Sequence, residues 1–172
     1  MKIIEILEKG HSKAITSKIV KHVGHNPVLF RELVGVFLAG PYRITQRAAW
    51  PLSICVVNHP KLVKPYLKAI IKYLDHPGIH DAVKRNTVRF LQFIDIPKSL
   101  QGRVVDICFG FLSNPREPIA VRVFSMTVLA NLAKQHPELK DELKIYIEDH
   151  LPFGGPAFRS RGYKILKLIS KP

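Results

Sequence analysis

The segment from Val121 to Leu132, VRVFSMTVLANL, decides the fold of this chain. An arginine near its start is followed by small and aliphatic residues with helical spacing. Equivalent arginines, Arg47, Arg85 and Arg159, together with Arg122 stand at intervals of 38, 37 and 37 residues. A fixed period of this size indicates a stack of helical hairpins. Hairpins of this kind must stack because one amphipathic hairpin cannot bury its apolar face alone.

Prolines and glycines divide the chain between these arginines. An X-Pro pair usually ends a helix, because proline lacks a backbone donor and disfavours helix in the residue before it. The segments between breaks show helical spacing of apolar residues, so we expect about nine or ten helices. The breaks fall at Gly10, Asn26-Pro27, Gly40-Pro41, His59-Pro60, His76-Pro77-Gly78, Ile96-Pro97, Asn114-Pro115, His136-Pro137 and 152–156.

The segment quoted first resembles the first helix of a HEAT repeat, and 84–94 and 158–169 are weaker copies of it. The chain is therefore similar to the HEAT and armadillo-like helical repeat family from about residue 12 to residue 171. This resemblance implies an all-α fold, a right-handed α-solenoid of about four to five stacked antiparallel helix pairs. We expect residues 1–172 to form a single HEAT-like repeat domain.

Two features depart from the pattern of that family. Pro51 lies inside the first helix of the second pair, which predicts a kink there. The acidic residue that usually precedes the repeat arginine is absent at all four positions. We nevertheless expect Arg47, Arg85, Arg122 and Arg159 to be structural, bonding nearby carbonyls or an adjacent repeat.

The charge of the chain favours polyanionic partners. Of its 172 residues, 27 are basic and 13 acidic, which gives a formal net charge of +14. The sequence contains neither a secretory signal pattern nor an apolar run of the roughly 18 residues that a membrane span needs. We therefore expect a cytoplasmic protein without a membrane span. Cys55 and Cys108 are far apart among apolar residues, which favours buried free thiols over a disulfide.

The segment after His59-Pro60 carries the clearest candidate binding surface. Lysines recur at intervals of 3, 4 and 4 residues, and at about 100° per residue of an α-helix they share one stripe, with apolar residues on the opposite side. A cationic stripe can follow phosphates, but it is also an ordinary solvated face. We call the four residues the lysine stripe: Lys61, Lys64, Lys68 and Lys72.

The other second helices do not continue this stripe. Only Arg103 joins it as a candidate contact for a macromolecule, on the predicted solvent side of the helix from Lys98 to Leu112. The final second helix is mainly acidic, with 5 acidic and 2 basic residues over 137–150. The pattern therefore predicts a patchy surface and argues against a continuous basic groove.

The sequence predicts no catalytic residues, no metal site and no cofactor. The histidine pairs His22/His25 and His76/His80 lack the further converging ligands that zinc requires. One HEAT-like family with catalytic activity, the alkylpurine DNA glycosylases, uses an Asp and aromatic residues in a basic concave groove. Here the single tryptophan, Trp50, stands beside a proline with no acid in the next turn. That enzyme remains only an alternative.

The leading hypothesis for function is a non-catalytic interaction module that binds a protein partner through its stacked surface. The alternative is nucleic-acid binding through the basic surface, because of the +14 net charge. The sequence does not set the oligomeric state.

Overall fold

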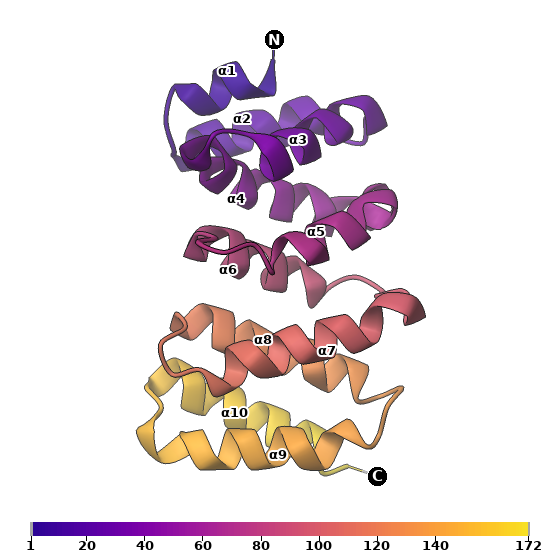
Figure 1. Ribbon diagram of the computed structural model, residues 1–172, viewed down its shortest axis with the longest axis vertical. Coiled ribbons are helices and arrows are strands. Elements are labelled where there is room, and N and C mark those ends of the chain that lie inside the picture. The colour runs from indigo at the N-terminus through magenta and orange to yellow at the C-terminus, as the bar shows by residue number, and fades with distance from the viewer. Residues whose placement is uncertain (1, 172) are drawn as a thin grey trace. The chain divides into compact units, whose positions relative to one another are not determined.

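The computed structural model describes residues 2–171, and all regular structure within that range is helical (Figure 1). The prediction of an all-α fold is confirmed. Most helices begin or end at the proline and glycine breaks. Their bounds are α1 Ile3–Glu8, α2 Lys13–Val23, α3 Pro27–Ala39, α4 Tyr42–Asn58, the 3₁₀ helix η1 Pro60–Tyr66, α5 Leu67–Tyr73, α6 Asp81–Leu91, α7 Lys98–Ser113, α8 Ile119–Leu132, α9 Leu139–His150, the 3₁₀ helix η2 Leu151–Phe153, and α10 Pro156–Ile169.

The chain folds into two compact units, Met1–Ile94 and Asp95–Pro172, which we call unit 1 and unit 2. Each unit contains stacked helices with a core of its own. The single domain expected from the sequence stays a prediction, as does the handedness of a superhelix.

Helix α4 is the centre of unit 1. It packs against α1, α2, α3, α6 and η1, so first helices lie against first helices and each pair closes on itself. The core between them is fully apolar at Phe30, Phe37, Leu52 and Ile70, each at most 1% exposed. The apolar stripes predicted from the sequence therefore meet in one place, as stacking of amphipathic hairpins requires.

The start of α3 shows how an X-Pro break sets a helix boundary. The Asn26 side-chain oxygen accepts hydrogen bonds from the backbone N–H groups of Val28 and Leu29, at 2.9 and 3.2 Å. Pro27 takes the first helical position, where a missing N–H costs nothing. Asparagine followed by proline thus caps and opens α3, whereas α2 ends earlier, at Val23, with Gly24 at its C-cap.

The segment that carries the lysine stripe differs from the predicted single α-helix. It runs as the 3₁₀ helix η1 to Tyr66 and becomes α-helical only at Leu67. Pro65 lies inside η1, and without an N–H it cannot donate the bond that an α-helix needs at that position. The prediction of one α-helical period was therefore wrong for the first half of this segment.

Helix α4 continues from Tyr42 to Asn58 through Pro51, which is buried. Proline in a helix interior leaves the carbonyl of the residue four positions earlier, here Arg47, without its usual donor. The kink expected at this position stays a prediction.

Helix α8, the segment quoted first, is the centre of unit 2. It packs against α7, α9 and α10, and nine of its residues are buried. The first helix that the sequence marked most clearly is thus enclosed by every other α-helix of unit 2. Small residues such as Ser125 and Ala130 let those neighbours approach from several sides.

Candidate functional site

All four residues of the lysine stripe are exposed on the outer side of η1 and α5. Helix rises of about 2.0 Å per residue in η1 and about 1.5 Å in α5 place Lys61 and Lys72 roughly 19 Å apart along the axis. The opposite side of the segment packs inward. Tyr66 meets Phe30 with ring centroids 6.0 Å apart, and Tyr73 meets Phe37 at 5.7 Å. The aromatic residues of this segment therefore serve the core, and its cations face outward.

Unit 1 carries most of the net charge. It has 15 basic and 5 acidic residues, a net of +10, whereas unit 2 has 12 and 8, a net of +4. Within residues 2–94, the lysine stripe makes no ion pair or hydrogen bond. The charges of the four lysines are therefore not neutralised by contacts within the unit.

Helix α3, the neighbouring second helix, adds little to this charge. Arg31 is exposed, but the carboxylate of Glu32 is engaged, because its Oε1 accepts a 2.6 Å hydrogen bond from the backbone N–H of Ile3 at the start of α1. Val28 is 60% exposed and Gly35 has no side chain. The exposed residues of α3 are therefore apolar or small, apart from a single cation.

Arg103 is exposed on α7, in unit 2, whereas the lysine stripe belongs to unit 1. The solvent side predicted for α7 also contains Gly102 and Asp106, and both are exposed.

Three of the four repeat arginines donate to backbone carbonyls that precede them in the chain. Arg47 donates through Nη1 to the carbonyls of Leu7 and Glu8 at the end of α1, at 2.8 and 3.2 Å. Arg159 donates to the carbonyls of Leu151 and Pro152, at 3.1 and 3.0 Å. A cation near a helix C-terminus is favourable because the last carbonyls carry partial negative charge.

Arg122 and Arg85 occupy equivalent positions in opposite environments. Arg122 is 7% exposed, its Nε donates to the Leu112 carbonyl at 3.1 Å, and its guanidinium lies 4.6 Å from the ring centroid of Phe158. Its Nη2 is buried without a partner, and burial lowers the pKa of the guanidinium. Arg85, in contrast, is exposed and makes no hydrogen bond within residues 2–171.

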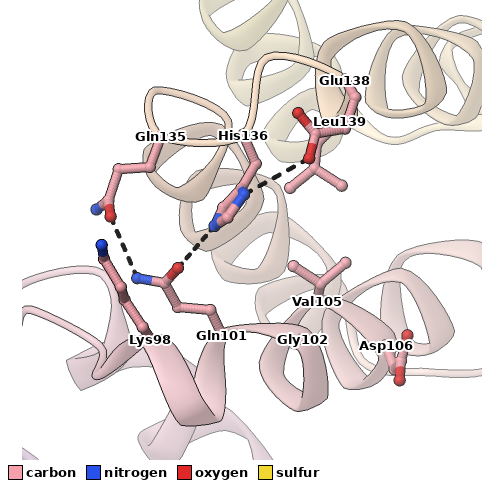
Figure 2. A pocket seen from close by; sticks show the side chains of 9 residues that line it. All are labelled: Lys98, Gln101, Gly102, Val105, Asp106, Gln135, His136, Glu138 and Leu139. Atoms are coloured by element: carbon pink, nitrogen blue, oxygen red, sulfur yellow. Dashed lines mark hydrogen bonds and ion pairs between the residues drawn. The ribbon is translucent and has the colours of Figure 1, made fainter.

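Unit 2 contains a groove that the sequence did not reveal. It encloses about 700 Å³ between α7 and the segment that leads into α9 (Figure 2). Residues spaced one helical turn apart on α7 form one wall, and the loop after α8 forms the other. The lining residues are Lys98, Gln101, Gly102, Val105, Asp106, Gln135, His136, Glu138 and Leu139.

A series of linked side-chain hydrogen bonds fixes the wall of this groove. Gln101 Nε2 donates to the carbonyl of Ile96 at 2.9 Å and to Gln135 Oε1 at 3.3 Å. Its Oε1 is then left as an acceptor, so His136 must donate from Nε2 across 2.7 Å. Nδ1 of His136 lies 3.5 Å from a Glu138 carboxylate oxygen, as Figure 2 shows. Partners 34 and 35 residues apart make this series, so no local pattern could predict it.

Both cysteines are buried and free, as the sequence predicts. Burial raises the pKa of each thiol to about 12, which keeps them protonated and poorly nucleophilic. Among residues 2–171, no group of three or more His, Cys, Asp or Glu side chains is placed to hold a metal ion. No helix in the same range combines the length and the apolar character needed to cross a membrane.

The sequence was compared with known families and proteins. The model of the HEAT repeat domain matches residues 3–169, which covers both units. No curated protein and no solved structure matches the chain. HEAT repeats generally serve as scaffolds, commonly for protein interaction. Since the family model spans nearly the whole sequence, the chain belongs to the HEAT repeat family.

Proposed function

We propose that the chain is a non-catalytic scaffold that binds a protein partner through an acidic surface of that partner. The observation that carries this proposal is the lysine stripe. Its four lysines are exposed and have no counter-charge within the described residues. One cation per turn over roughly 19 Å suits a partner helix that presents one carboxylate per turn.

The surroundings of the stripe favour a protein over a nucleic-acid duplex. A protein that binds duplex DNA neutralises about 6 to 10 phosphates with basic side chains that form a continuous surface. Here α3 continues the surface with one arginine, the exposed apolar side chain of Val28 and the bare backbone of Gly35. Apolar and small residues beside cations are the composition of a protein-contact surface.

Nucleic-acid binding is the second candidate, and the +10 charge of unit 1 favours it. Within residues 2–171, five exposed cations without partners lie on first helices, which pack side by side as α2, α4 and α6. They are Lys13, Lys18, Lys21, Arg43 and Arg85. This first-helix face is a separate surface from the lysine stripe, so the two candidates can be tested by separate variants.

Site-specific photo-cross-linking in extracts of the cells that express the chain tests the leading proposal. A cross-linking residue replaces Ala69, which is exposed within the lysine stripe, and a control places it at Ala14 on α2. We expect a protein adduct at position 69. The triple reversal K64E/K68E/K72E should remove it, while the matched reversal K13E/K18E/K21E should leave it.

A protein adduct at position 69 that persists in K64E/K68E/K72E would refute the role of the stripe. Fluorescence anisotropy with duplex and single-stranded oligonucleotides at two salt concentrations tests the second candidate. Non-specific binding to phosphates must weaken steeply with salt, and K13E/K18E/K21E should then reduce it more than K64E/K68E/K72E does. Absence of oligonucleotide binding at low salt would eliminate this candidate.

A further inference from the structure

The groove of unit 2 has chemically different ends. At one end stands Lys98, exposed and without a partner within residues 2–171, near the side-chain amide of Gln135. Gln135 uses its oxygen to accept from Gln101, so its NH₂ group remains as a donor. This end therefore offers positive charge and N–H donors.

The other end offers acceptors. Asp106 is exposed and makes no hydrogen bond or ion pair within the described residues. The Glu138 side chain is 71% exposed, and only one of its oxygens faces His136, at 3.5 Å. Figure 2 shows Lys98 and Gln135 on one side of the view and Asp106 on the other. The groove is thus polarised along α7.

The separation of the two charged ends sets the length of a ligand. Lys98 and Asp106 are eight residues apart in the same helix, with Gly102 midway. At about 1.5 Å per residue this is roughly 12 Å. An extended polypeptide advances about 3.3 Å per residue, so the ends lie about four residues of extended chain apart.

The middle of the groove suits a polypeptide backbone. Val105 and Leu139 give apolar walls. A Cβ added to Gly102 would meet nothing within 4 Å, so packing does not require glycine there. Glycine inside a helix costs about 0.5 to 1 kcal/mol relative to alanine, and its bare backbone allows close approach of another chain.

We propose that this groove binds an extended polypeptide segment with a carboxylate at the Lys98 end and a lysine or arginine side chain at the Asp106 end. Apolar residues between the two charges would lie against Val105 and Leu139. The exposed carboxylates of Asp106 and Glu138 oppose a phosphate backbone, so the groove selects protein over nucleic acid. This inference rests on the proposed protein-binding function and specifies a second contact for it.

Binding of fluorescein-labelled Asp-Leu-Gly-Leu-Lys, measured by anisotropy at low salt, tests the proposal. The neutral peptide Asn-Leu-Gly-Leu-Gln is the reference probe. We expect K98E and D106K each to weaken binding of the charged peptide about tenfold, because each turns an attraction into a repulsion. K164E is the matched control for K98E, since Lys164 is an exposed lysine of unit 2 on α10, outside the groove. It should change the affinity less than twofold.

A second readout locates the peptide. In ¹H–¹⁵N spectra of the full chain, the Gly102 amide should shift on addition of Asp-Leu-Gly-Leu-Lys and stay unchanged with the neutral peptide. Equal affinity for both peptides, or unchanged affinity in K98E and D106K, would overturn the proposal. Displacement of the peptide by an oligonucleotide would overturn it as well. The variant K64E/K68E/K72E alters only unit 1, so it should lose the protein adduct and keep the binding of the peptide. If it keeps the protein adduct, only the role of the lysine stripe is contradicted. If peptide binding does not depend on Lys98 and Asp106, only the groove proposal is contradicted.

Discussion

Replacement of Arg122 by methionine measures what the repeat arginine contributes to stability. Methionine preserves the length of the apolar stem but removes the hydrogen bond to Leu112 and the contact with Phe158. A hydrogen bond to a charged group contributes about 1.5 to 3 kcal/mol. A cation over an aromatic face contributes about 0.5 to 2 kcal/mol.

The burial of the guanidinium opposes these gains. Arg122 is 7% exposed and its Nη2 has no partner. Leaving such a donor unsatisfied costs about 1 to 3 kcal/mol, and R122M removes that cost. The difference predicts that R122M lowers the free energy of unfolding by about 1 to 2 kcal/mol.

Urea denaturation followed by circular dichroism at 222 nm measures this change. Arg85→Met is the matched control, because Arg85 holds the equivalent position but is exposed and makes no hydrogen bond within the described residues. Its effect should stay within about 0.5 kcal/mol. An R122M variant as stable as the parent, or more stable, would show that desolvation outweighs both contacts and would refute the reasoning.

Three further predictions concern other buried or helical positions. Because burial raises the pKa of Cys55 and Cys108 to about 12, neither should react with iodoacetamide at pH 8 until urea unfolds the chain, and the free energy of unfolding should fall as the pH rises from 9 towards 12. Mass spectrometry measures the labelling, and an iodoacetamide adduct on the native chain would contradict this prediction. Gly35→Ala should stabilise by about 0.5 to 1 kcal/mol in urea denaturation, since its Cβ would meet nothing within 4 Å, whereas Gly40→Ala should destabilise, since its Cβ would lie 2.5 Å from a backbone oxygen. Asn26→Ala should cost about 1 kcal/mol by loss of the two capping bonds at the start of α3, and an unchanged urea midpoint would argue against a capping role.

The helical fold could be predicted because local chemistry sets each boundary. Asn26 followed by Pro27 caps and opens α3 through local hydrogen bonds, and Gly24 ends α2 in the same local way. The recurrence of arginine every 37–38 residues marked the first helices, although Arg122 is buried and Arg85 is exposed at that position. The 3₁₀ turn at Pro65 was missed although its signal was present: a proline five residues after Pro60 removes an α-helical donor.

The groove of unit 2 could not be predicted in the same way. Gln101 and His136 look like ordinary polar residues, and His136 before a proline suggests only a turn. Their 2.7 Å hydrogen bond exists because packing brings residues 35 positions apart together. The lysine stripe, in contrast, depends only on the spacing of four lysines within one segment, and all four are exposed although the first half of that segment is a 3₁₀ helix.

The 37–38-residue period gives the second helix of each pair the same set of surface positions. Gly35, Lys72, Gly110 and Glu148 follow one another at 37, 38 and 38 residues, and all four are exposed. In the four successive second helices, this one surface position is thus a glycine, a cation, a glycine and an anion, while the buried positions beside it stay apolar. The binding preference of such a repeat protein can therefore change at one surface position at a time, by evolution or by design, with little loss of stability in the folded core.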